Sequence, residues 1–304
     1  MEPLSLIVLL VMGTVAGAIN AAVGSGSLLT LPVLMAVGVP PGVAVRTNTV
    51  GMFFSTLGSC LGYRREIAAE KQHLTPLTIT ATVGATAGAL LLLVSPAAAL
   101  DVVVPVLIVL ALAMVLFQKP LTAAIRSGRE RRATRREERG LPAADTDTEA
   151  DTATDAETDA STDLAAGASG PSRATGASAE RSPLRSPALI GSLGAASVYG
   201  GYFTAAQGVL YLGILGIFTG RSMGSVNSIK NLMSLAVNLA AAVVYVIAFF
   251  LIDAEIVWIG SAAIALGALL GGFFGAHLAK RMPEWLLRGI IVVVALAALI
   301  RQVL

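Results

Sequence analysis

Long apolar runs alternate with short polar stretches along most of this chain. The apolar segments form two sets of five, at about 4–23, 27–38, 43–63, 74–94 and 101–118, then at about 187–205, 209–219, 224–251, 256–279 and 285–304. Several segments exceed about 18 residues, which is long enough for a helix to cross a bilayer. The pattern therefore predicts an all-α polytopic membrane protein.

The second segment of the first set is too short to cross a bilayer comfortably. It follows a break made of four small residues, Gly24, Ser25, Gly26 and Ser27, and it stops at Pro40-Pro41. Within a membrane such a break must be buried in protein or line a cavity, because each unpaired N–H or C=O group costs several kcal/mol. The short helix would start at this break, so its free N–H groups and about half a unit of positive dipole charge should face the gap. We expect such a gap to prefer an anion.

The two sets resemble copies of one unit. The pattern Gly84-x3-Gly88-x7-Pro96 recurs as Gly271-x3-Gly275-x7-Pro283, with every position shifted by the same number of residues. Arg46-Thr47-Asn48 has a looser counterpart in Lys230-Asn231, and the first break has one in Ala206-Gln207-Gly208. A repeat with broken segments in matching places is typical of secondary transporters and marks their substrate site. The spacing of the glycines is also that of closely packed membrane helices.

The positive charges indicate how the two copies are oriented. In the first copy they lie in the loop between the third and fourth segments (Arg64, Arg65 and Lys71), whereas in the second copy they follow the fourth segment (Lys280 and Arg281). Lys and Arg are enriched in cytoplasmic loops, so the copies should face opposite ways. This requires either five crossings per copy or three crossings plus a re-entrant hairpin. We predict two inverted-topology repeats of about four to five helical segments each, with broken or re-entrant short helices and with Arg221 also in the cytoplasm.

The residues between the two sets differ in composition from both. They begin with an Arg-rich run, become acidic and rich in Thr and Ala at 145–163, and end rich in Gly, Ser and Pro. Such a segment cannot bury enough apolar surface to offset its ordering entropy. We predict a first transmembrane repeat at 1–118, a disordered cytoplasmic linker at 119–186 and a second transmembrane repeat at 187–304, in a multi-pass protein of the plasma (inner) membrane. The Arg run has a second interpretation, contact with anionic lipid.

The titratable residues exclude several classes of site. Cys60 is the single cysteine, which excludes an internal disulfide and a Cys-based metal cluster. Outside the linker every acidic residue lies at a segment end or in a loop, namely Glu2, Glu66, Glu70, Asp101, Asp253, Glu255 and Glu284. We therefore expect no buried carboxylate relay, no metal and no cofactor. An intramembrane enzyme would need a nucleophile with a nearby base or a pair of carboxylates, and the sequence offers neither.

Arg46 and Lys230 are cations placed inside predicted membrane segments. A cation at the centre of a membrane helix costs about 2.5–3.5 kcal/mol, so such residues tend to be functional. The alternative is that each side chain reaches the nearer headgroups. Because the two recur in corresponding segments, we favour a role in binding or attracting an anion. Polar side chains near them could donate further hydrogen bonds, with interhelical bonding as the alternative; the full candidate set is Gly24, Ser25, Gly26, Ser27, Arg46, Asn48, Gln207, Gly208, Lys230 and Asn231.

The broken segments also resemble a known family. The first half contains A-G-A-I-N-A-A-V-G-S-G-S-L-L-T-L-P-V-L and then G-V-P-P-G-V-A-V-R-T-N-T-V, which resembles the first-half signature of the TauE/SafE sulfite-exporter family. The second half contains Y-G-G-Y-F-T-A-A-Q-G-V-L-Y-L, N-S-I-K-N-L and G-A-L-L-G-G-F-F-G-A-H-L-A-K-R-M-P, which is similar to the second-half signature. The resemblance implies an inner-membrane permease for small anions, often sulfite or organosulfonates. Ser25 and Ser27 interrupt the family's glycine run, and Ala206-Gln207-Gly208 replaces it in the second half, so the substrate could differ.

Together these features predict a secondary transporter or uniporter that moves a small oxyanion across the plasma membrane by rocking two inverted halves about a site near the midplane. The expected partners are the anion and the lipid bilayer, with no nucleic acid and with a homo-oligomer left open. Two alternatives stay open as well: a carrier of another small metabolite or of a cation, and a non-transporting membrane scaffold whose linker is the interaction element.

Overall fold

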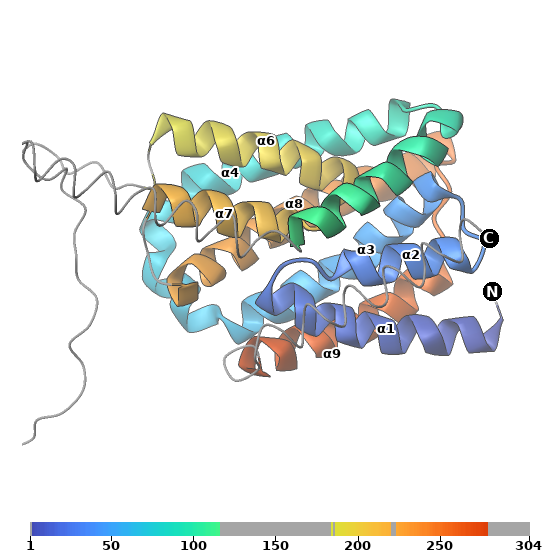
Figure 1. Ribbon diagram of the computed structural model, residues 1–304, viewed down its shortest axis with the longest axis horizontal. Helices are drawn as coiled ribbons and strands as arrows, with labels where there is room; N and C mark the ends of the chain where they lie inside the picture. Colours follow the sequence, from blue (N-terminus) through green and yellow to red (C-terminus); the bar gives the residue numbers. More distant parts are fainter. Residues whose placement is uncertain (1, 116–183, 185, 220–222, 279–304) are drawn as a thin grey trace, which may run out of the picture.

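The computed structural model describes residues 2–115, 184, 186–219 and 223–278 of the 304 (Figure 1). In these ranges all regular structure is helical: α1 Pro3–Ala22, α2 Ser27–Ala36, α3 Pro41–Gly62, α4 Arg64–Val94, an unlabelled helix Ala97–Val115, α6 Pro187–Phe203, α7 Gln207–Thr219, α8 Met223–Ile252 and α9 Trp258–Leu278. Five of these helices have spans apolar and long enough to cross a membrane, so the predicted all-α polytopic membrane fold is confirmed. The predicted segment at 285–304, nearly all of the linker, Arg221, Lys280 and Arg281 lie outside the described residues.

The junction between α3 and α4 differs from the prediction. Only Tyr63 separates the two helices, and Arg64, Arg65 and Lys71, which were expected in a loop, belong to the first turns of α4. Apolar periodicity detects only the part of a helix that is buried in the membrane or in protein. The polar turns before it contain Arg, Glu, Ala and Lys, which are good helix formers, so the helix begins well before the apolar segment.

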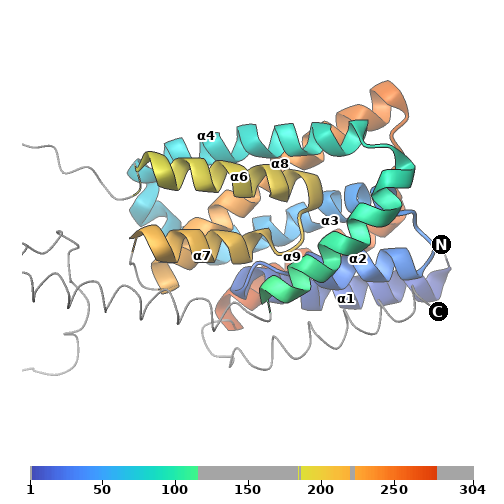
Figure 2. The same cartoon turned by 45° about the horizontal axis from the view of Figure 1, so that its top comes forward.

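The chain turns back on itself inside the protein at two places (Figures 1 and 2). The helix α1 runs inward from the end of the molecule that holds the N-terminus, and α2 returns toward that end. The helices α6 and α7 form the same kind of hairpin from the opposite end. With 10 and 13 residues, α2 and α7 are about 15 and 20 Å long, shorter than the roughly 30 Å hydrocarbon core. The helix directions are consistent with one re-entrant hairpin at the start of each repeat, and in the first repeat with three crossings after it.

The helices pack into two bundles, and each bundle takes helices from both halves of the sequence. In the first bundle α1 and α3 pack against α9, and in the second bundle α6 and α8 pack against α4. The long helices α3 and α8 then pack against each other across the seam between the bundles. Among the labelled helices of the described residues, each of the main contacts within the first bundle has a counterpart in the second, which is consistent with two copies related by a two-fold axis.

Glycines permit the close approach of these helices. A Cβ atom added to Gly271 of α9 would collide with the carbonyl oxygen of Thr14 on α1, and one added to Gly88 of α4 would collide with that of Val198 on α6. Because the obstacle is backbone in each case, a larger residue would separate the helices. The prediction that the spaced glycines serve close helix packing is confirmed.

The two ends of the molecule differ in the elements they hold. The α3–α4 junction, the start of α6, the end of α7 and the start of α8 all lie at the end opposite the N-terminus (Figure 1). The exposed side chains of Arg64 and Arg65 are at this end. The point where the linker joins α6 is therefore at the same end of the molecule as these two cations.

Candidate functional site

The first break is a compact turn enclosed by protein. The helix α1 ends at Ala22 and α2 begins at Ser27, and Gly24 between them has φ +82°, a left-handed conformation that favours glycine. Ser25 and Ser27 are buried. The first amides of α2 are used locally, because Leu28 N–H donates to the Ser25 carbonyl at 3.1 Å and Leu29 N–H to that of Gly26 at 2.9 Å.

The second break adopts the left-handed backbone conformation at residues other than glycine. The helix α6 ends at Phe203 and α7 begins at Gln207. Between them, Thr204 has φ 60° and Ala206 has φ 58°. A left-handed conformation costs roughly 1–2 kcal/mol for such residues, so the surrounding packing must hold it in place. Gln207 and Gly208, which the sequence placed in the break itself, form the first turn of α7.

The two breaks touch each other. The amide of Gly208 donates a hydrogen bond to the carbonyl oxygen of Gly24 at 3.2 Å. A Cβ atom on Gly208 would lie 2.5 Å from the Cα atom of Gly24, and one on Gly24 would collide with Gly208 in turn. Only glycine fits at either position. The sequence led us to expect that N–H groups at the start of each short helix are free; in this conformation Gly208 N–H is paired with the other break.

Lys230 lies beside this contact and is fully buried. Its Nζ atom donates to the carbonyl oxygens of Asn20 at 2.9 Å and Ala21 at 3.1 Å, in the last turn of α1. Asn227 and Asn231 also donate to the Ala21 carbonyl, at 3.2 and 3.3 Å. The last carbonyls of a helix lack intrahelical partners and carry the negative end of the dipole, so a cation is favoured there. An ammonium group has three donors, and among the described residues Lys230 uses two.

The structure places Arg46 at a different depth. Its Nε atom donates to the backbone carbonyl oxygen of Glu255 at 3.0 Å, in the connection after α8, and its side chain is half-buried. Lys230, in contrast, lies near the start of α8. The structure thus brings Gly24, Gly208, Lys230 and Asn231 together and leaves Arg46 nearer the end of the molecule that holds the N-terminus.

Several candidate side chains are buried with a polar atom that has no hydrogen-bond partner among the described residues. These atoms are Ser25 Oγ, Asn48 Nδ2, Gln207 Oε1 and Asn231 Oδ1; the other end of Asn48 accepts a hydrogen bond from Thr30 Oγ1 of α2. Leaving a buried polar group unpaired costs about 1–3 kcal/mol, and native proteins contain few such groups. The four atoms belong to residues that the sequence alone had suggested as candidates, and this supports a site for water or a ligand around the two breaks.

Sequence reasoning missed some residues that hold the breaks in place. Tyr245 OH donates to the Gly201 carbonyl at 2.7 Å, and Thr49 Oγ1 lies 2.9 Å from Thr204 Oγ1. Tyrosine and threonine are common in membrane helices, so nothing in the sequence distinguishes these two. Asn20, whose Nδ2 donates to Ser55 Oγ at 3.2 Å, did carry a signal: it is a polar residue inside an apolar run, one helical turn before the break.

Comparison with known proteins adds the following. The model of the family described as "Sulfite exporter TauE/SafE" matches residues 9–301. The chain is 30% identical over 112 residues to "Probable membrane transporter protein ORF9" of Sinorhizobium sp, which is 37% of this chain and 42% of that protein. It is 32% identical over 109 residues to "Probable membrane transporter protein YfcA" of Escherichia coli (strain K12), 36% of this chain and 40% of that protein. The matches thus cover about two-fifths of these relatives, and no solved structure matches.

Proposed function

The chain belongs to the TauE/SafE sulfite exporter family, and from this premise we propose that it is a secondary transporter or uniporter for a small oxyanion such as sulfite, an organosulfonate or a related anion. The observation that carries the proposal is the position of Lys230. A fully buried cation stands where the two helix breaks meet, and its two hydrogen-bond partners are neutral carbonyls.

An anion would offset the cost of burying this charge. Ionised donors form the stronger hydrogen bonds, of about 1.5–3 kcal/mol each. An oxyanion beside Lys230 would take up the donor that the described residues leave over. The side-chain carbonyl oxygens of Gln207 and Asn231 have no partner among the described residues, so rotation of each amide would turn its NH2 group toward the other oxygens of the anion, and Asn231 would give up its bond to the Ala21 carbonyl. The site then needs no metal and no carboxylate.

Contacts across the seam suggest how the protein moves. The bonds from Lys230 on α8 to the end of α1, and the bond from Gly208 to Gly24, join the second bundle to the first. Rocking of one bundle against the other would break these contacts and open the site to one side of the membrane at a time. The described conformation, with the contacts formed, is the closed state of such a cycle.

The proposed orientation follows from the exposed cations. Arg64 and Arg65 are exposed at the end where the linker joins α6. Because cytoplasmic segments are enriched in Lys and Arg, this end is the cytoplasmic one in a plasma-membrane protein, and the linker is cytoplasmic. Arg46 then lies toward the outer face, where its charge would attract the anion.

Flux measurements in proteoliposomes test the proposal. Lys230→Met keeps the length of the side chain and removes its charge, and it should weaken the apparent affinity for the anion about 10- to 100-fold. Adding Arg46→Gln should lower uptake further at low salt. Arg64→Gln, on an exposed cation, is the control and should leave flux unchanged. Full anion flux in the Lys230→Met, Arg46→Gln double variant, at equal amounts of folded protein, would reject the site.

A further inference from the structure

One face of α8 continues beyond Lys230 as a row of buried polar side chains. Asn231, Ser234 and Asn238 recur at three- and four-residue spacing, so they lie on one side of the helix. All three are at most 3% exposed. Ala241 and Tyr245 continue the same face and belong to a buried cluster that contains residues of α1, α2 and α3. The polar row therefore faces the seam between the two bundles.

These side chains are not satisfied by the protein around them. Asn231 Oδ1, Ser234 Oγ and Asn238 Oδ1 have no hydrogen-bond partner among the described residues. Within the part of the chain that the structure describes, the Nδ2 atom of Asn238 donates only to its own helix, to the Ser234 carbonyl at 3.0 Å. At about 1–3 kcal/mol for each unpaired group, three in a row on a membrane helix are expensive unless water or a ligand visits them.

The polar row connects the regions of the two cations that sequence alone placed in one site. This face of α8 begins at Lys230, its polar row ends at Asn238, and beyond the apolar Ala241 it reaches the buried ring of Tyr245, which interacts electrostatically with Arg46. The helix rises by about 22 Å between Lys230 and Tyr245, which is most of the hydrocarbon core. Lys230 and Arg46 thus stand near the two ends of this face.

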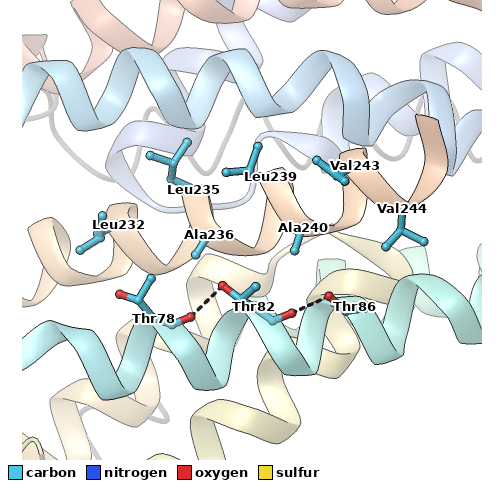
Figure 3. A pocket seen from close by; sticks show the side chains of 10 residues that line it. All are labelled: Thr78, Thr82, Thr86, Leu232, Leu235, Ala236, Leu239, Ala240, Val243 and Val244. Carbon is cyan, nitrogen blue, oxygen red and sulfur yellow. Dashed lines mark hydrogen bonds between the residues drawn. The ribbon is translucent and has the colours of Figure 1, made fainter. Parts of the chain in front are cut away.

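Another face of α8 is apolar (Figure 3). There Leu235, Leu239 and Val243 line a groove against three threonines of α4, Thr78, Thr82 and Thr86. The threonine hydroxyls each donate to a carbonyl of their own helix at 2.9 Å, so they offer the groove little but their methyl groups. With Leu239 47% exposed and Val243 46% exposed, this face suits lipid.

We propose that Asn231, Ser234 and Asn238 line a hydrated route along which the anion passes between Lys230 and the outer region of Arg46. The proposal rests on the transport function given above and extends it to residues beyond the breaks. Amide and hydroxyl groups can replace the hydration shell of an oxyanion without the fixed charge that would trap it. Tyr245, bonded to Gly201, closes the outer end of the route in this conformation.

Thiol labelling tests whether the route is wet. In a protein whose single cysteine is removed by Cys60→Ala, Ser234→Cys and Asn238→Cys are compared with Leu239→Cys on the lipid face of the same helix. A charged methanethiosulfonate reagent reacts with the thiolate, which forms only where water reaches, so the two route positions should react at least about tenfold faster than position 239. Equal rates at all three positions, or no reaction at 234 and 238, would overturn the proposal.

A second measurement uses the unaltered protein, in case the variants fold poorly. Tyr245 and Tyr211 are both fully buried tyrosines with a hydrogen-bonded hydroxyl, but Tyr211 bonds to Ser197 inside the second bundle, away from the route. Radiolysis of bound water oxidises nearby rings, so Tyr245 should be oxidised about tenfold more than Tyr211. Equal oxidation of the two rings would mean that no water reaches the seam, and it would overturn the proposal.

The two proposals fail in different ways. If the route is wet but Lys230→Met carries full anion flux, the function proposed above fails while the hydrated seam stands. If Lys230→Met loses flux and the seam is dry, the anion site stands and the route proposed here is wrong.

Discussion

Replacing Gly208 by Ala tests the contact between the two breaks. The new Cβ atom would lie 2.5 Å from the Cα atom and 2.9 Å from the carbonyl oxygen of Gly24. Both obstacles are backbone, and Gly24 itself is in a left-handed conformation with φ +82°, so the turn cannot yield without losing its shape. The breaks must separate, which also lengthens the hydrogen bond from Gly208 N–H to Gly24.

The expected loss of stability in Gly208→Ala is the sum of three contributions. Forcing one extra carbon into a packed site costs about 1–3 kcal/mol, and a lost hydrogen bond costs about 1 kcal/mol. Alanine regains up to about 1 kcal/mol because it is the better helix former. Gly208→Ala should therefore destabilise the protein by about 1–4 kcal/mol.

The control variant is Gly213→Ala, on the same helix α7. An added Cβ atom at Gly213 of α7 meets nothing within 4 Å, so Gly213→Ala should only gain helix propensity, up to about 1 kcal/mol. The assay is reversible unfolding in mixed micelles of increasing SDS content, with anion flux of the same preparations measured in proteoliposomes. The Gly208 variant should lose both stability and flux. Equal stabilities and equal flux for the two variants would refute the contact.

The remaining predictions concern the bundles and the linker. Gly271→Ala should lower the free energy of unfolding by about 1–3 kcal/mol, and with it the thermal midpoint, because its Cβ atom would strike the Thr14 backbone. The control is Gly191→Ala on α6, where an added Cβ atom meets nothing within 4 Å. Equal thermal midpoints for the two variants would contradict the packing of α9 against α1. Deleting residues 126–180 should leave flux and thermal midpoint unchanged, because the proposed site lies wholly within the two bundles. Loss of flux on deletion would contradict this expectation. Loss of a co-purifying protein partner, with flux absent before and after the deletion, would favour the scaffold alternative.

Much of the fold was predictable because the membrane imposes simple rules. Segment length and hydropathy found the described helices, since a helix in lipid must satisfy its own backbone and cover it with apolar side chains. The start of α4 at Arg64 was missed for the same reason: its first turns lie outside that environment. The exchange of α4 and α9 between the bundles was also missed, because glycine spacing predicts a close contact and does not name the partner helix.

The candidate site was predictable in its residue types more than in its arrangement. Glycines in a broken segment and a cation inside an apolar run are costly features, so the sequence alone singles out Gly24, Gly208 and Lys230. Their mutual contact depends on how two bundles meet, which no local pattern encodes. The pairing of Arg46 with Lys230 in one site rested on their matching positions in the two copies. Related positions in inverted copies lie toward opposite ends of the molecule, and Arg46 accordingly bonds to Glu255 near the end that holds the N-terminus.

The most direct measurement for the buried cation is a thermal-shift titration of purified protein with sulfite, sulfate, organosulfonates and carboxylates, in parallel with Lys230→Met. At least one of these anions should raise the unfolding temperature of the unaltered protein in a concentration-dependent way, and the same anion should have no effect on the Lys230→Met protein. An equal shift in both proteins, or stabilisation by cations and neutral metabolites alone, would contradict an anion site at Lys230.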